Sequence, residues 1–329
     1  MTKFKLLPNY SIINRQLTFI MLKKWQLKAI IQKGISYLPY KTNINFFIQK
    51  YITKKILLTD DFFEKRMIHA RDHLDFLKKN ENNHFEEKTA LELSYDQYPI
   101  ISIAIFLSGF DIVISLNNAN LVNKKTIVQT LKMFVEWSKK DKLEEYLENI
   151  NDQRWEQLQE VISLQKKLNE EQICRILRLK LMSQDARNTK LPAQSIDFII
   201  SNNIYEHTYP LVLKFILKEF KRILAPQGIM SHFVDLSDHF AHFDKNITIY
   251  NFLKYSEKQW QKIDNSIQPQ NRLRWKDYEK MYQDLEIIYT SEKLEKGDLK
   301  ALATVSIHEM FNNFDMEELA ISHGYLVTS

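Results

Sequence analysis

Residues 89–118 read TALELSYDQYPIISIAIFLSGFDIVISLNN, and their order predicts a strand, a buried helix and a second strand. The segment TALELS has the composition of a short strand. Pro99 lies near the start of the apolar run over 98–116, which changes near Gly109 from helical to β-branched composition. Because this run contains Gly109 and Asp111, we expect a core helix and a buried strand, not a membrane span.

Strand candidates alternate with helical patterns through the rest of the chain. They are LKLMSQ (179–184), SIDFIIS (195–201), GIMSHFVDL (228–236), ALATVSIHE (301–309) and AISHGYLVTS (320–329). This alternation predicts an α/β fold with a doubly wound, mostly parallel sheet and helices on both faces. We expect a helical extension over 1–84 and a main domain over 85–329, with crossover helices inserted over about 119–178.

The N-terminal extension is strongly basic. Residues 1–59 contain eleven basic side chains and no acidic ones, so the rest of the chain carries −6 against a total of +5. Mixed apolar and lysine residues predict a helix that stops at Gly34, and further helices are expected over 43–58 and 61–79. The first helix could lie on an anionic membrane surface or hold an acidic substrate. The favoured alternative is that the apolar side of this helix packs on the domain while its lysines face solvent. No motif indicates a nucleic-acid partner.

Composition indicates a globular protein of the cytoplasm. Hydrophobic residues make up 44% of the 329 residues, which supplies an ordinary core. The single cysteine, Cys174, excludes a disulfide framework and is expected to be a buried structural residue. No apolar run with a small-residue cleavage site is found near the start, so we expect a cytoplasmic location, with membrane association through residues 1–59.

Polar residues gather where the strand over 195–201 should end. Asp185 and Ala186 precede this strand, Asn202 and Asn203 follow it, and the next helix closes with the turn APQG. In doubly wound sheets, ligands bind at the carboxyl edge. The block over 184–228, together with LEL and a later proline in the first stretch, resembles class I S-adenosylmethionine-dependent methyltransferases, in particular a bacterial group.

The resemblance implies a Rossmann-like, seven-stranded methyltransferase fold with S-adenosylmethionine as its cofactor. In the family, two glycines after the first strand let the backbone approach the methionine end of the cofactor, and an acid after the second strand binds the ribose. A further acid holds the adenine amino group. The matching cofactor positions in this sequence are Glu92, Ser94, Asp96, Asn117, Asp185, Ala186, Asn202 and Asn203.

Two functions remain open because three of these positions depart from the pattern. The first is methyl transfer to an oxygen or nitrogen of a small molecule or a glycan precursor. The second is a catalytically degenerate protein that keeps the fold as a binding or assembly module, which Ser94, Asp96 and Asn117 suggest. A carboxylate at Asp96 would repel the carboxylate of the cofactor unless a cation lies between them.

Candidate catalytic residues lie after the fourth and fifth strands. His207, Asp235 and His239 could act as a base, which is needed only for a hydroxyl or a protonated nitrogen acceptor. The candidate substrate-binding residues are His232, Asp238, His242, Arg272 and Arg274. The run over 231–244 is also rich in potential metal ligands, but its spacing matches no established metal motif, so we expect acceptor binding and no metal there.

Overall fold

The strand, helix and strand expected over residues 89–118 lie at the centre of the fold. The computed structural model describes residues 23–38, 57–80, 85–94, 96–117 and 121–328. Thr89–Leu93 forms β1, Ile100–Leu107 forms α4 and Ile112–Leu116 forms β2. The two strands pair in parallel. The helix expected over 43–58 lies almost wholly outside the described residues.

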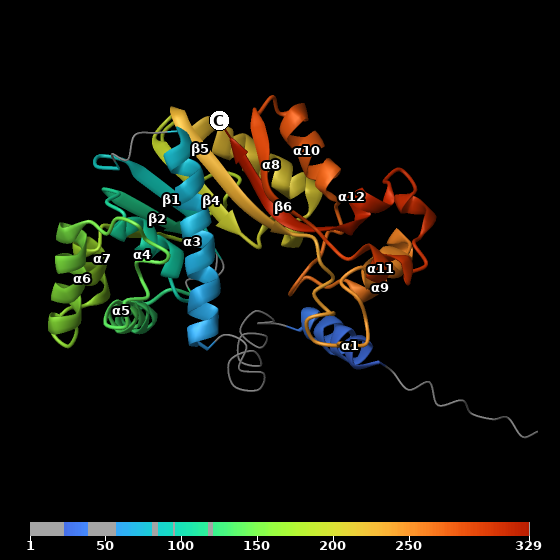
Figure 1. The fold of residues 1–329 in the computed structure, drawn as a ribbon, viewed down its shortest axis with the longest axis horizontal. Helices are drawn as coiled ribbons and strands as arrows, with labels where there is room; N and C mark the ends of the chain where they lie inside the picture. The colour runs from blue at the N-terminus through green and yellow to red at the C-terminus, as the bar shows by residue number, and fades with distance from the viewer. Residues whose placement is uncertain (1–22, 39–56, 81–84, 95, 118–120, 329) are drawn as a thin grey trace, which may run out of the picture.

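Seven strands form one sheet in the order β3-β2-β1-β4-β5-β7-β6 (Figure 1). The remaining strands are β3 (Leu179–Met182), β4 (Ile196–Asn202), β5 (Leu224–Asp235), β6 (Tyr289–Lys296) and β7 (Ile321–Thr328). Strands β1 to β5 run parallel to one another, whereas β7 is antiparallel to both of its neighbours, β5 and β6. The doubly wound α/β sheet is therefore confirmed, with a mixed edge.

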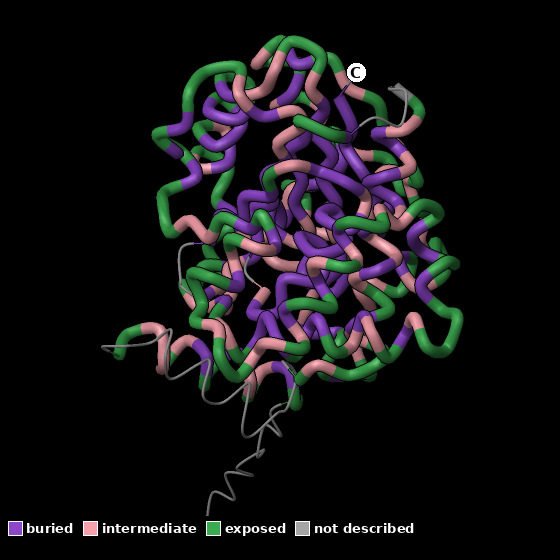
Figure 2. The backbone as a smooth tube through the Cα atoms, turned by 90° about the vertical axis from the view of Figure 1, so that its left-hand side faces the viewer, coloured by how far each residue is buried: buried purple, intermediate pink, exposed green. Residues whose placement is uncertain are grey.

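Helices cover both faces of the sheet, and Figure 2 shows the buried backbone gathered between the exposed outer segments. Helices α3 to α7 pack in the larger hydrophobic core, and α8 and α10 pack in a second core. Their bounds are α3 (Asp60–Asn80), α5 (Lys124–Ser138), α6 (Asp152–Leu164), α7 (Glu170–Ile176), α8 (Pro210–Ile223) and α10 (Trp275–Asp284). Three of them, α5 to α7, fill the stretch where inserted helices were expected. Cys174 lies half-buried on α7.

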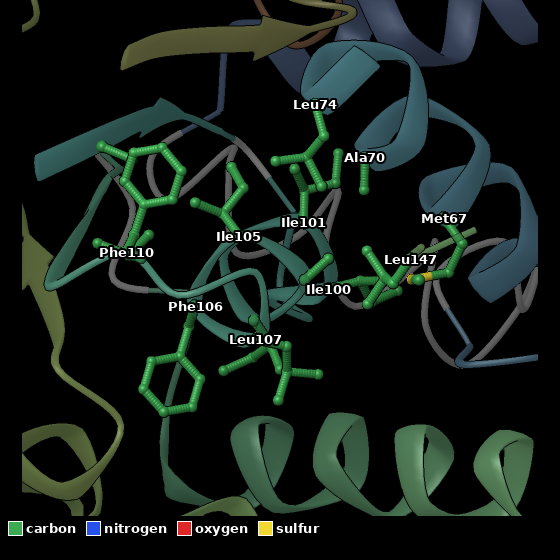
Figure 3. Packing of buried hydrophobic residues seen from close by; sticks show 14 of the residues in the cluster. Met67, Ala70, Leu74, Ile100, Ile101, Ile105, Phe106, Leu107, Phe110 and Leu147 are labelled. Atoms are coloured by element: carbon green, nitrogen blue, oxygen red, sulfur yellow. The ribbon is translucent and has the colours of Figure 1, made fainter. Parts of the chain in front are cut away.

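Helix α4 is apolar on every side, and all of its residues are buried. In Figure 3, Ala70 and Leu74 of α3 lie next to Ile101 of α4. The helix is followed by Gly109, whose φ of +107° is a conformation that side chains other than glycine rarely adopt. The expected core helix is thus confirmed. None of the described helices combines the length and apolar character that a membrane crossing needs.

The assignment of ALATVSIHE as a strand is wrong. Leu299–Ala303 forms the helix α11, because the side chain of Asp298 accepts hydrogen bonds from two N–H groups of its first turn. The strand beside β7 is β6, with the sequence YTSEKLEK. It lies at the edge of the sheet with mostly exposed or half-buried residues, so it lacks the apolar pattern that would have predicted it.

The helix before the domain, α1 (Lys24–Ser36), packs against the segment after β5. It continues two residues beyond Gly34, so the predicted stop is wrong. The Trp25 ring lies 5.6 Å from the Phe240 ring, and the backbone N–H of Trp25 donates a 3.3 Å hydrogen bond to the side chain of Asp244. These contacts join α1 to a third hydrophobic cluster, which also contains residues of α9 (Glu257–Ile263) and α12 (Met316–Ala320). The predicted helix over 61–79 is confirmed as α3.

One polar contact crosses the apolar interface between β1 and α4. Ser102, the only polar residue of α4, donates a 2.5 Å hydrogen bond from Oγ to Oε2 of Glu92. Glu92 is only 4% exposed. Burial raises its pKa to about 7, although the Ser102 hydrogen bond opposes this shift. At neutral pH a large fraction of Glu92 is therefore protonated.

This pKa predicts a specific loss of stability with rising pH. A carboxyl whose pKa is raised on folding stabilises the folded state below its unfolded pKa of 4.5, and this contribution disappears as the pH rises through about 7. Relative to the Glu92→Gln variant, the wild type should lose up to about 3 kcal/mol of unfolding free energy between pH 4.5 and 7.5. Urea unfolding at several pH values measures this difference.

The control for this experiment is Glu171→Gln, because Glu171 lies exposed on α7. Its unfolding free energy should follow that of the wild type at every pH. Parallel curves for the wild type and Glu92→Gln would show that Glu92 does not titrate in this range.

Candidate functional site

The loop after β1 is held by an ion pair to α3. The Asp96 Oδ2 atom lies 2.6 Å from Arg66 Nε, and its Oδ1 atom lies 3.1 Å from a terminal nitrogen of the same guanidinium. Both side chains are partly exposed, at 17% for Arg66 and 27% for Asp96. The contact to the terminal nitrogen is a hydrogen bond between charged groups, and the contact to Nε is a close ion pair. Arg66 therefore cancels the charge of Asp96 where the resemblance aligns a glycine.

Ser94 connects this loop to the end of β2. Its N–H donates a 3.1 Å hydrogen bond to the carbonyl of Leu116, and its hydroxyl accepts one from the N–H of Asp96. Ser94 is absent from the residues with positive φ, so its backbone conformation does not require glycine. The two non-glycine residues thus build a loop that is fixed by its own side chains and by Arg66.

The other positions aligned with the cofactor are placed less uniformly. Asn117 lies buried after β2, with its N–H donating to the carbonyl of Met182 at 2.8 Å. Asp185 is about half exposed, and both of its carboxylate oxygens bind the guanidinium of Arg187, which lowers the pKa of Asp185. Ala186 is buried next to it. The carboxylate expected at the adenine position is therefore already paired.

Asn203 connects the loop after β1 to the polar residues after β4. It has a positive φ of 54°. Its Oδ1 atom lies 3.5 Å from Arg66, and its Nδ2 donates a 3.1 Å hydrogen bond to Glu206. Asn202 instead points to α3, where its Oδ1 lies 3.1 Å from His73 Nε2. One amide thus contacts both halves of the site.

The candidate catalytic residues His207, Asp235 and His239 come together at this edge. The rings of His207 and His239 lie 4.6 Å apart, and His239 Nε2 lies 3.5 Å from Asp235. The more exposed His242 lies 3.8 Å from the same Asp235 oxygen. Glu206, which was not among the predicted site residues, joins this cluster. Glu206 lies in the 3-10 helix η2 (Tyr205–His207), soon after β4. Its position next to His207, after a predicted strand, could have identified it as a site residue.

Burial and neighbouring charge set the ionisation of this cluster. Burial, followed by the nearby His239, lowers the pKa of His207 to about 4. Burial and the charge of Asp235 raise the pKa of Glu206 well above its usual range. Burial would also raise the pKa of Asp235, but the nearby His239 and His242 rings and the hydrogen bond from the Ser237 N–H outweigh it and hold the value below the usual range. Asp235 is therefore the ionised carboxylate of the cluster.

Four predicted substrate-binding residues are used by the protein itself. His232 is fully buried beside the Tyr205 ring, with Nδ1 2.8 Å from the hydroxyl of Ser201. Asp238 is fully buried and accepts a hydrogen bond from Asn251. We leave these two residues out of the proposed site because an acceptor cannot reach them.

The two arginines are also buried. Arg274 donates hydrogen bonds to the carbonyls of Leu236, Leu319 and Ile321, which ties the end of β5 to the start of β7. Arg272 binds the carbonyl of Tyr255 and the carboxylate of Glu257. We leave both out as well, so only His242 of this group stays at the site.

A small cavity opens beside His239, under helix α1. Its lining residues are Lys28, Gln32, His239, Phe240, Trp260, Asp264, Asn265, Gln268 and Gln270. A second cavity lies between α3 and the segment around Tyr146, away from these residues. Neither cavity is lined by Glu92, Asp185 or Asn203 among the described residues.

The charges of Arg66 and Asp96 match those at the methionine end of S-adenosylmethionine. That end of the cofactor carries both an ammonium and a carboxylate. The Arg66–Asp96 pair offers one partner of each sign, next to the carboxyl ends of β1 and β4. The fit is weaker at the ribose, because Asn117 supplies an amide where the family has an acid.

Residues 156–231 match the family model described as a methyltransferase domain. This segment runs from α6 into β5 and includes Asn202, Asn203 and His207. No curated protein sequence matches the chain significantly.

Several solved structures share part of the chain course. The PH0226 protein of Pyrococcus horikoshii OT3 is 13% identical, with a TM-score of 0.43 over 82% of this chain and 92% of that one. A geranyl diphosphate C-methyltransferase of Streptomyces coelicolor A3(2) is 10% identical, with a TM-score of 0.42 over 79% and 76%. Phosphoethanolamine N-methyltransferase 2 of Haemonchus contortus is 10% identical, with a TM-score of 0.44 over 86% and 58%.

TM-scores below 0.5 carry no argument about function. The similarity to methyltransferases rests on the matched segment and on the seven-stranded sheet. Residues 156–231 are thus similar to a methyltransferase domain, and the chain forms a seven-stranded α/β sheet, the fold that the resemblance implies.

Proposed function

We propose that the protein transfers the methyl group of S-adenosylmethionine to an oxygen or nitrogen of a small molecule or a glycan precursor. The observation that carries this proposal is the Arg66–Asp96 pair at the position of the usual glycine loop. Without Arg66, Asp96 would repel the carboxylate of the cofactor. With it, the guanidinium can bind that carboxylate while Asp96 binds the ammonium.

The acceptor is assigned to the cavity beside His239. S-adenosylmethionine supplies an activated methyl group, so the protein mainly has to orient the acceptor and exclude water. His239 lines the cavity and lies beside the ionised carboxylate of Asp235. A histidine oriented by a carboxylate is suited to take the proton of an acceptor hydroxyl. Lys28 of α1 also lines the cavity and favours an acidic acceptor.

A degenerate binding or assembly module is the second candidate. It is supported by Asn117 at the ribose position and by the loop after β1, where the Asp96 N–H already donates to Ser94. An N–H group used in this way is not available to a ligand. The two candidates differ in one measurable property, which is affinity for the cofactor.

Calorimetric titration with S-adenosylmethionine and its demethylated product tests the cofactor site. We expect the wild type to bind near the micromolar range, at about −8 kcal/mol. The Arg66→Met variant should bind at least about tenfold more weakly, because it loses the partner of the cofactor carboxylate. Arg175→Met is the matched control, since Arg175 forms an exposed ion pair on α7, and its affinity should be unchanged.

No wild-type binding up to millimolar concentration would support the degenerate module. In that case, the double variant Ser94→Gly with Asp96→Gly separates two causes. Restored affinity would identify the side chains of the loop as the obstacle, whereas continued absence of binding would contradict the alignment of this loop with the glycine motif.

Methyl transfer itself is tested with His239→Ala. The assay measures the demethylated cofactor formed with a panel of small alcohols, phenols, amines and nucleotide sugars. For a hydroxyl acceptor, the loss of the base should lower kcat about 100-fold or more, with unchanged affinity for the cofactor. His308→Ala, which changes a histidine near the 3-10 helix η4 (Glu309–Phe311), is the control. An unchanged kcat in His239→Ala would remove His239 from the catalytic role.

We also propose a cytoplasmic location, with contact to a membrane surface through the basic extension. Leu27, Ile30 and Ile31 of α1 are each about half exposed, whereas Trp25 and Ala29 are buried against the domain. An exposed apolar stripe among lysines is typical of helices that lie on anionic lipid. The rest of the basic extension, over 1–22 and 39–56, lies outside the described residues.

Co-sedimentation with vesicles that contain phosphatidylserine measures this contact. Changing Leu27, Ile30 and Ile31 together to serine should reduce the bound fraction, and added salt should reduce it for the wild type. Leu211→Ser, at an exposed leucine of α8, should have no effect. Equal sedimentation of the wild type and the triple variant would exclude α1 as the anchor.

A further inference from the structure

We propose that Glu206, His207 and His239 bind one divalent transition-metal ion at the carboxyl end of β4. One potential ligand atom from each residue lies within 4.8 Å of the other two. The sequence hypothesis of a metal in the run 231–244 did not include Glu206 or His207. The site depends only on these side chains, so it stands whether or not the protein transfers methyl groups.

The backbone brings the three side chains together from two strand ends. Glu206 and His207 lie in η2 directly after β4, and His239 follows β5, the parallel neighbour of β4. The two imidazole rings meet edge to face, with centroids 4.6 Å apart and an angle of 71°. Ligands of a tetrahedral ion at 2.0–2.1 Å lie about 3.3 Å apart, so modest side-chain rotations would complete the site.

His207 is already held in the form that binds metal. Its Nδ1 atom lies 2.6 Å from the carbonyl oxygen of Pro269. Because a carbonyl only accepts hydrogen bonds, Nδ1 must donate, and the lone pair of a neutral His207 is then on Nε2. A histidine ligand fixed through its other nitrogen by a backbone carbonyl is the usual arrangement at metal sites.

Buried polar atoms of the cluster lack partners. Glu206 is 4% exposed, and its Oε2 atom has no hydrogen-bond partner among the described residues. Its Oε1 atom accepts a hydrogen bond from the amide of Asn203. The Nε2 atom of His239 is also buried and has no hydrogen-bond partner among the residues that the structure describes. The nearest Asp235 oxygen lies 3.5 Å from it. A cation would satisfy both atoms, and leaving them unpaired costs free energy.

Asp235, His239 and His242 form an overlapping group of potential ligands. Both groups use His239, so one ion cannot occupy both. We assign the ion to the Glu206 group for two reasons. His207 is oriented by Pro269, and Glu206 is the carboxylate with an unused oxygen. His242 is 54% exposed and lies 3.1 Å from the hydroxyl of Ser237. Asp235, whose carboxylate lies 3.5 Å from the Nε2 atom of His239, would then place a negative charge beside the ion.

The ligand types indicate which ions would bind. Two imidazoles and one carboxylate suit zinc, iron and related transition metals, whereas magnesium and calcium prefer oxygen ligands. Three protein ligands leave a position open, as in catalytic zinc sites. An acceptor oxygen that occupied it would become more acidic through binding to the ion. His239 also lines the cavity assigned to the acceptor, and with the ion bound it would act there as a metal ligand in place of a general base.

Zinc titration of the full, chelator-treated chain tests the site without any cofactor or acceptor. We expect one equivalent of zinc chloride to bind in calorimetry, and cobalt chloride to give the visible absorption of a tetrahedral ion. Glu206→Gln and His207→Ala should each weaken zinc binding by at least about tenfold. The glutamine variant preserves shape, so it reports the charge without loss of folding, which thermal melting would verify.

Two variants distinguish this site from its neighbours. His242→Ala should leave zinc affinity within about twofold, and His308→Ala, remote from the cluster in sequence, should have no effect. Absence of wild-type binding would overturn the proposal. Wild-type affinity in Glu206→Gln and His207→Ala would also overturn it, and so would loss of binding in His242→Ala alone, which would assign the ion to the Asp235 group.

Discussion

The ion pair between Arg66 and Asp96 determines what the central edge of the sheet can bind. It joins the helix before β1 to the loop after β1, and it replaces an uncompensated carboxylate with a neutral pair. Exposed ion pairs contribute little to stability, but this one is partly buried and contains a hydrogen bond between the two charged groups. The pair therefore matters more for the charge at this edge of the sheet than for the energy of the fold.

The sequence predicted the sheet well because burial leaves a clear periodic signal. Strands β1, β2, β4 and β5 are apolar, and α4 is apolar on every side. The edge strand β6 carries no such signal, since its charged residues face solvent. The segment ALATVSIHE was predicted as a strand from its composition, but its first residues belong to the helix α11, whose N-terminus is capped by Asp298.

The site was harder to predict because its contacts join residues distant in sequence. Arg66 lies 30 residues before Asp96, and no motif contains it. Arg274 and His232 have the residue types of a ligand site, yet they are fully buried and bind protein groups. Composition alone does not separate an arginine that holds carbonyls inside the protein from one that awaits a ligand. The cluster of His207, Asp235 and His239 could be expected, since parallel strands end at the same edge.

The amide of Asn203 has a consequence for how the two halves of this edge communicate. Its oxygen faces Arg66 and its nitrogen holds Glu206, so both contacts depend on one side chain with a single orientation. A ligand that drew Arg66 toward itself would release one end of that amide and alter the other. Thermodynamic reciprocity then requires a ligand bound at Glu206 to change the affinity of Arg66 for its own ligand by the same factor. Ordered association of two ligands would follow from the geometry of one asparagine, without any large movement of the chain.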